Sequence, residues 1–143
     1  MRPHVMSLSL KASDYRRIVE HARAGLPNEA CGLIAGRLAG DAKQVEKIYL
    51  LENPDACPEH FSIPPKAQLE AIRDMRSLGL APLGNFHSHP STPAHPSDED
   101  INLAYDASAS YCILSLAGKE PVLKCFRIER ASRATVEEII EIV

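Results

Sequence analysis

The sequence predicts a layered α/β or α+β protein in which helices flank a mixed sheet. Apolar runs and alternating segments, both typical of strands, occur between segments with helical periodicity. Some strand-like segments are adjacent in the sequence and others are separated by a helix, so a strictly repeating parallel sheet is not indicated. A length of 143 residues suits one compact layered core, and we expect residues 1–143 to form a single domain.

The individual elements follow from periodicity and from glycine and proline punctuation. Strands are expected at 4–10, 31–38, 44–51, 60–63, 81–88, 111–116 and 122–128, and helices at 13–24, 66–78 and 97–107. The charges of 135–143 suit a helix, but its β-branched content favours a strand. In the second helix, Leu69, Ile72 and Met75 are expected to face the core.

Composition excludes some functions. A net charge of −3 with scattered Lys and Arg offers no electrostatic footprint for nucleic acid. No run approaches the roughly 20 apolar residues that span a bilayer, and no signal peptide is recognisable, so we expect a cytoplasmic protein without membrane contact.

The four cysteines form no Cys-x-x-Cys pair, which argues against a zinc ribbon or a thioredoxin motif. Cys31, Cys112 and Cys125 lie in apolar runs, and we expect them to be buried free thiols. Cys57, in a proline-flanked stretch, is the candidate for an exposed thiol.

A candidate metal site lies at the end of the 81–88 strand. His87 and His89 are two residues apart, so their rings project from the same face and can reach one ion. Imidazole suits zinc, and Asp100 follows at a distance that allows it to return as a carboxylate ligand. Three protein ligands leave one tetrahedral position for water, as in catalytic zinc sites.

Each residue also has a simpler interpretation. A His-x-His pair alone is weak evidence for a metal, and Ser97 with Asp100 forms the pattern of a helix capping box. Glu29 could be an ordinary solvated charge at the start of a strand. A zinc hydrolase, however, needs an acidic residue that does not bind the metal but accepts a proton from water. His95 and His60 are interpreted as loop residues without a metal role.

Together, Glu29, His-x-His-Pro at 87–90 and Ser97-x-x-Asp100 resemble the JAMM (MPN+) metalloprotease motif, and Glu-Ala-Cys-Gly-Leu-Ile-Ala-Gly at 29–36 is similar to the segment around that family's catalytic glutamate. The similarity extends from the first expected helix to about Leu116. It implies an MPN/cytidine-deaminase-like fold, a curved, mixed and mostly antiparallel sheet flanked by helices.

The same resemblance implies the roles of the site residues. His87, His89 and Asp100 would bind zinc, while Glu29 would act as general base and then protonate the leaving amine. Ser97 would donate a hydrogen bond to the oxyanion of the reacting amide.

The resemblance also implies a substrate. Members of the family cleave amide bonds after the C-terminal glycines of ubiquitin-like proteins. The compact chain and its 53–63 segment are similar to bacterial members that act on sulfur-carrier proteins. Pro64 stands where many relatives have an acidic residue, which concerns the substrate groove rather than the zinc site. A homodimer is compatible with the family. The alternatives are a non-catalytic MPN scaffold that binds protein partners and a zinc hydrolase of a small peptide or amide.

Overall fold

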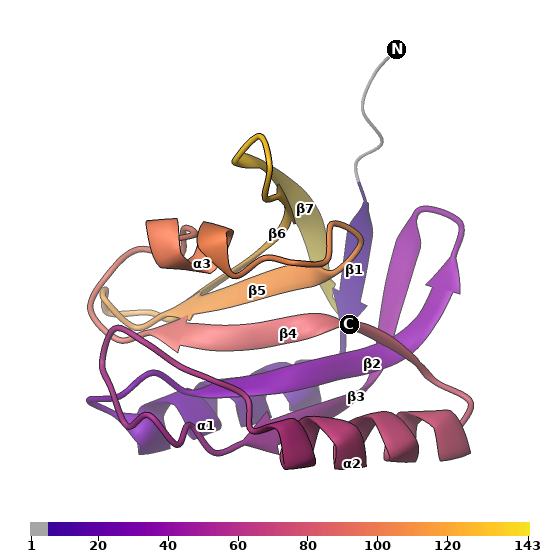
Figure 1. Cartoon of the computed structure of the whole chain (residues 1–143), viewed down its shortest axis with the longest axis horizontal. Coiled ribbons are helices and arrows are strands. Elements are labelled where there is room, and N and C mark those ends of the chain that lie inside the picture. Colours follow the sequence, from indigo (N-terminus) through magenta and orange to yellow (C-terminus); the bar gives the residue numbers. More distant parts are fainter. Residues whose placement is uncertain (1–5) are drawn as a thin grey trace.

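The computed structural model describes residues 6–143, which form a mixed sheet with three helices (Figure 1). The strands are β1 (Ser7–Leu10), β2 (Cys31–Ala39), β3 (Ala42–Leu51), β4 (Ala81–His89), β5 (Ser110–Ser115), β6 (Val122–Glu129) and β7 (Ala134–Ile142), and the helices are α1 (Ala12–Gly25), α2 (Pro65–Ser77) and α3 (Asp98–Asn102). The expected first strand is present from Ser7 onward, and its residues 4 and 5 lie outside the described residues. No helix within 6–143 is long and apolar enough to cross a membrane.

The strands follow the order β1-β3-β2-β4-β5-β6-β7, and β1 pairs with both β3 and β7, so the sheet closes into a barrel. The expectation of a mixed, mostly antiparallel sheet flanked by helices is confirmed, because four strand pairs are antiparallel and three are parallel. The sheet was expected to be curved, but it is a closed barrel. Closure depends on pairing between strands from the two ends of the chain, about which local periodicity carries no information.

The core divides between the two faces of the sheet. α1 buries Ile18, Val19 and Ala22 in the largest cluster, which also contains Phe86 of β4. On the other face, α2 covers β2, and a separate cluster forms on β5 and β6 beside α3. Strand alternation places Asn85, His87 and His89 on this second face, opposite in direction to Phe86. The outer face of β4 therefore lies between two packed clusters.

Three expected details of the helices and strands are wrong. Residues 60–63 form no strand. The helix expected to reach residue 107 ends at Asn102, because the Asp106 side chain accepts hydrogen bonds from the backbone and hydroxyl of Ser108 and stabilises a turn instead. Leu69 is half exposed, while Met75 is buried as expected. The ambiguous C-terminal segment is a strand, β7, as favoured.

The cysteines are only partly as expected. Cys112 and Cys125 are buried, but they are joined by a disulfide, so the expectation that both are free thiols is wrong. The two residues face each other directly in the β5–β6 ladder, a register that the sequence does not reveal. Cys31 is a buried free thiol, and Cys57 is free and partly exposed.

A buried polar chain links three strands of the barrel. Lys43 of β3 donates to Ser110 Oγ of β5 at 2.6 Å, and that hydroxyl donates to Glu138 Oε1 of β7 at 2.7 Å. Burial lowers the pKa of Lys43 despite the opposing effect of Glu138. A charged pair that shares a hydroxyl is costly to break, because either partner would remain buried and uncompensated.

Gly84 offers a test of the β4–β5 pairing. It has a φ of +156°, and an added Cβ would lie 1.9 Å from the carbonyl oxygen of Ser110. We expect Gly84→Ala to lower the free energy of unfolding by about 1–3 kcal/mol or more, because the strand pair must separate to relieve the clash. Urea denaturation measures this difference. Gly118→Ala is the matched control, since its nearest neighbour would lie at 3.9 Å, and an equal loss in both variants would contradict the argument.

Candidate active site

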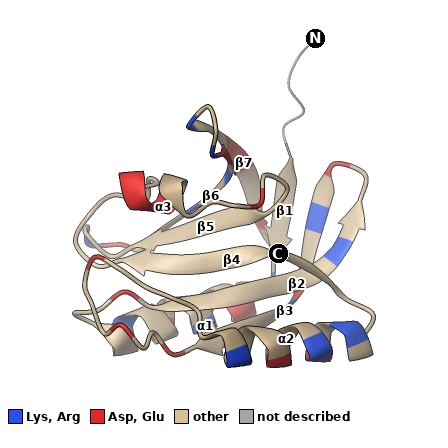
Figure 2. Cartoon of the chain, in the orientation of Figure 1, with Lys and Arg blue, Asp and Glu red and all other residues tan. Residues whose placement is uncertain are grey.

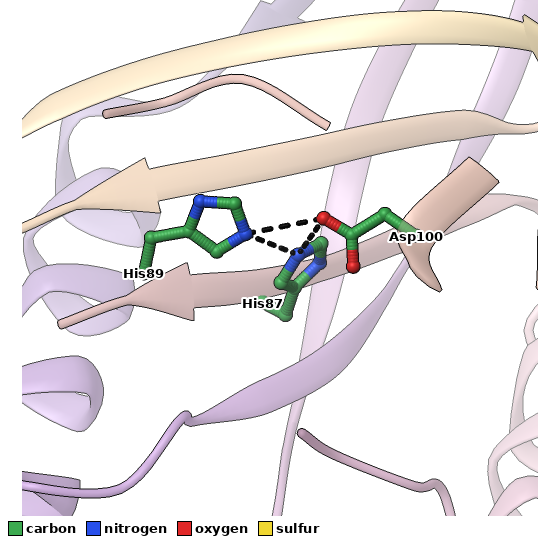
Figure 3. Close-up of side chains that lie close together, drawn as sticks. All are labelled: His87, His89 and Asp100. Carbon is green, nitrogen blue, oxygen red and sulfur yellow. Dashed lines mark hydrogen bonds and ion pairs between the residues drawn. The ribbon is translucent and has the colours of Figure 1, made fainter. Parts of the chain in front are cut away.

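The two histidines at the end of β4 point toward one position (Figure 3). His87 Nε2 and His89 Nε2 lie 3.2 Å apart, and Asp100 Oδ2 lies 3.2 Å and 3.1 Å from them. Donors about 2.0–2.1 Å from one ion at tetrahedral angles would lie about 3.3–3.4 Å from each other, so these separations fit a zinc-sized ion. Both imidazoles are buried, and the three residues form a group that could hold a metal ion.

Asp100 reaches the histidines from the first turn of α3. Its Oδ2 accepts a hydrogen bond from the Ser97 N–H at 2.9 Å, and Ser97 Oγ accepts one from the Asp100 N–H at 3.0 Å. The capping-box interpretation is therefore confirmed. Burial opposes ionisation of Asp100, but its hydrogen bonds to His87 and His89 outweigh burial and hold its pKa well below the usual range. The cap fixes the carboxylate in the orientation that faces the two rings.

The loop between β4 and α3 supports the second histidine. His89 Nδ1 lies 2.9 Å from the Pro93 carbonyl oxygen, an interaction that places the ring proton on Nδ1 and leaves Nε2 free to bind a metal. Ser115 anchors the same loop by donating to the Thr92 carbonyl oxygen at 2.6 Å. His95 packs edge-on against Phe126, in keeping with its interpretation as a loop residue.

Glu29 lies beside the histidines because of strand pairing. Cys31 of β2 is opposite His87, so the next positions outward bring Glu29 opposite His89. Hydrogen bonds between Ala30 and Ser88 extend the pairing to this point. Glu29 is only 6% exposed, so the alternative that it is a solvated charge is wrong. Burial raises its pKa to about 7, although His89 opposes that change.

The surroundings of the histidines are acidic. A cavity of about 350 Å³ is lined by Glu29, His89 and Ser97, together with Glu59, Asp98 and Glu99. Among the described residues that line it, none is Lys or Arg. Figure 2 shows the same acidic character at the start of α3. This concentration of negative charge favours a bound cation.

Sequence reasoning missed the contribution of the loop between β3 and α2. Asn53 uses its full hydrogen-bonding capacity there. Its Nδ2 donates to the carbonyl oxygens of Glu29 and His60 at 3.0 Å and 2.9 Å, and its Oδ1 accepts from the N–H groups of Asp55 and Ser62. The Glu29 N–H donates to the Cys57 carbonyl oxygen at 2.9 Å. Both backbone groups of Glu29 are thus held by this loop.

The same loop also contacts the candidate metal ligand His87. The Phe61 ring stacks on His87 with 4.6 Å between ring centroids. His60 lies between Asp55 and Glu99 and bridges the loop to α3. An Asn-Pro dipeptide marks a loop in the sequence, but nothing in it indicates which backbone groups the asparagine will bind.

Comparison with known proteins identifies this arrangement. The profile of a family described as prokaryotic homologs of the JAB domain matches residues 11–129. The chain belongs to this family. It is 31% identical over 142 residues to the CysO-cysteine peptidase of Mycobacterium tuberculosis, covering 97% of this chain and 93% of that protein. It is 32% identical over 117 residues to the desampylase of Haloferax volcanii, covering 78% and 83% of the two chains.

Solved structures agree with the family assignment. A protein from Desulfitobacterium hafniense, whose structure was determined in solution, superimposes with a TM-score of 0.87 and 50% identity over 95% of this chain and 92% of that one. A JAB1/MPN domain protein from Archaeoglobus fulgidus gives a TM-score of 0.57 at 23% identity over 94% and 98% of the two chains, which supports the fold alone. The relatives of this JAB-family chain are named as a peptidase and a desampylase, which supports a hydrolase.

The buried carboxyl group of Glu29 predicts a pH-dependent stability. Its folded-state pKa of about 7 lies above the ordinary value of 4.5, because the ionised carboxylate is unfavourable in the folded protein. The free energy of unfolding therefore falls as the pH rises from about 4.5 to about 7. We expect metal-free Glu29→Gln to match the wild type near pH 5 but to exceed it by about 1–3 kcal/mol near pH 8. Urea denaturation with chelator present measures both values, and a difference that is independent of pH would contradict the assignment.

Proposed function

We propose that this JAB-family chain is a zinc-dependent metallopeptidase. Its substrate would be the amide bond after the C-terminal Gly-Gly of a ubiquitin-like sulfur-carrier protein. The observation that carries the proposal is the convergence of two imidazoles and one carboxylate beside the buried carboxyl group of Glu29. The name of the mycobacterial relative, a CysO-cysteine peptidase that aligns over almost the whole chain, supports this substrate class.

His87, His89 and Asp100 would hold the zinc ion. Two neutral nitrogen donors and one carboxylate are a set that zinc prefers, and three protein ligands leave one position for water. When bound, zinc supplies Lewis acidity, which lowers the pKa of its water to about 7 and polarises the scissile carbonyl. The cation would also reduce the repulsion between the neighbouring acidic side chains Glu29, Asp98 and Glu99.

Glu29 would move the proton. Its carboxyl group lines the same cavity as His89 and Ser97, so it can reach water and substrate there. A pKa raised to about 7 makes its carboxylate a stronger base than an ordinary glutamate, and a substantial share of the group is ionised near neutral pH. It would accept the proton from the attacking water and then pass that proton to the leaving amine. Asn53 and Cys57 would hold its backbone during both transfers.

Ser97 would stabilise the developing charge on the carbonyl oxygen. Its Oγ accepts the hydrogen bond from the Asp100 N–H, which leaves its own O–H free to donate. The residue is exposed and lines the same cavity as Glu29. The proposed donor and the proposed base therefore face one space.

The position of the site between a loop and α3 favours an extended substrate segment. The loop at 53–63 contacts His87 through Phe61, and His60 bridges this loop to Glu99 of α3. A glycine-rich tail has no side chains that would prevent it from lying between the loop and α3. The leaving amine would lie in the cavity of about 350 Å³ that Glu29 lines, where Glu29 can protonate it.

We expect the protein to release the extension from a sulfur carrier that has residues added after its C-terminal Gly-Gly, as read by mass spectrometry. Chelator should abolish release and zinc should restore it. Glu29→Gln should lower kcat by about 100–10,000-fold, because the general base is lost while the volume is kept. Full activity in Glu29→Gln would reject the proposed base.

The alternatives separate in the same assay. A non-catalytic scaffold would not release the extension and would not need zinc. The proposed peptidase would bind one zinc ion per chain. A hydrolase of small amides would cleave a short peptide that contains the Gly-Gly and the added residues as efficiently as it cleaves the whole carrier. We expect kcat/KM to be higher for the carrier.

A second prediction concerns the proposed oxyanion donor. Ser97→Ala should lower kcat by about 100–1,000-fold with little change in KM, because the lost hydrogen bond strengthens as charge develops. It should also lower the free energy of unfolding by about 0.5–2 kcal/mol through loss of the cap. Ser97→Thr keeps both the hydroxyl donor and the cap acceptor and is the control. A kcat that falls equally in Ser97→Ala and Ser97→Thr would contradict the role.

A further inference from the structure

The two histidines of the proposed zinc site differ in what supports their second nitrogen. His89 Nδ1 lies 2.9 Å from the Pro93 carbonyl oxygen. His87 Nδ1 is buried and has no hydrogen-bond partner among the described residues. A metal ligand needs that nitrogen to be held, because its hydrogen bond fixes which ring nitrogen keeps its lone pair.

A second buried atom without a partner lies nearby. Asn85 Oδ1 is likewise buried and without a hydrogen bond within residues 6–143. Asn85 and His87 are two residues apart on β4, so their side chains project from the same face of the strand. Both line one cavity of about 50 Å³. A donor and an acceptor that each lack a partner thus share one small space.

The other side chains around this cavity do not offer an acceptor to His87 Nδ1. Four are apolar, namely Phe61, Leu103, Ile113 and Ile128. The Tyr111 hydroxyl already donates to the Asp106 carbonyl oxygen at 2.9 Å and accepts from its N–H at 3.1 Å. Asp100 approaches His87 at the other nitrogen, Nε2.

We propose that Asn85 is a positioning residue for the zinc ligand His87, an inference that rests on the proposed metal centre. Its Oδ1 accepts the Nδ1–H of His87 through one water in the shared cavity. The cavity is large enough, since about 50 Å³ exceeds the roughly 10–15 Å³ that one water needs. The Cα atoms of residues two apart on a strand are about 6.6 Å apart, so side chains that lean toward each other come within the roughly 5–6 Å that one bridging water spans.

This contact holds His87 in the tautomer whose Nε2 lone pair faces Asp100 and His89. A neutral amide suits the position, because a further carboxylate would add to the repulsion among Glu29, Glu99 and Asp100 in the metal-free protein. The amide also fixes its own orientation, since only its oxygen can accept from an N–H donor.

Zinc affinity, measured by competition with a chromophoric chelator, tests the inference without any assay of activity. We expect Asn85→Leu, which keeps the size but removes the acceptor, to weaken zinc binding by about 10–100-fold. Asn85→Asp keeps an acceptor oxygen and should bind zinc at least as tightly as the wild type. Ile113→Val, which changes the volume of the same cavity without touching polar atoms, should stay within about twofold.

The outcomes separate the inference from the proposed function. Zinc affinity in Asn85→Leu equal to the wild type would overturn the role of Asn85, as would equal losses in Asn85→Leu, Asn85→Asp and Ile113→Val. A wild-type protein that binds no zinc would overturn the metal centre itself. Nitrogen-15 NMR of the unsubstituted, metal-free protein needs no variant to fold. There His87 Nε2 could donate to Asp100 instead, so we expect the neutral ring of His87 to carry its proton on Nδ1, and a neutral ring with its proton on Nε2 would overturn the inference.

Discussion

The register between β2 and β4 is the constraint on which the site depends. Because Cys31 is paired with His87, Glu29 falls opposite His89 although about sixty residues separate them in the sequence. Hydrogen bonds between Ala30 and Ser88 hold the pairing at its outer end. A slip of one residue would turn every side chain of β4 to the other face, so the barrel core and the site share one register. Packing of Phe86 in the core thereby fixes its neighbours on the opposite face.

The same arrangement places the buried Glu29 and the partly buried Asp100 close to several exposed acids. Glu29 is buried, Asp100 is held ionised by its contacts to His87 and His89, and further acids line the adjoining cavity. Burial is the main cause of the raised pKa of Glu29, and the charges of Asp100 and Glu99 raise it further, so without a cation this grouping opposes folding. The stability of the barrel, including the buried chain from Lys43 to the C-terminal strand, must therefore exceed the cost of assembling the acids.

Sequence reasoning succeeded where the deciding interaction is local. The period of a strand places His87 and His89 on one face, and a capping pattern fixes Asp100 relative to Ser97. That Glu29 lies with them came from family resemblance, because strand register cannot be read from one sequence. Barrel closure and the Cys112–Cys125 bond were missed for the same reason. The support given by Asn53 was also missed, since an Asn-Pro loop indicates a turn but not the partners of its side chain.

Two interpretations of Ser97 and Asp100, as helix cap and as site residues, describe the same hydrogen bonds. The Asp100 N–H binds one acceptor position of Ser97 Oγ, and the Ser97 N–H binds Asp100 Oδ2, the same oxygen that faces His87 and His89, so neither cap contact uses up its side-chain group. What remains free is the Ser97 O–H, and the Asp100 oxygen keeps a lone pair toward His87 and His89. A helix of five residues has little stability of its own, so the cap also maintains its geometry. Structural and chemical demands on these residues are therefore met together rather than in competition.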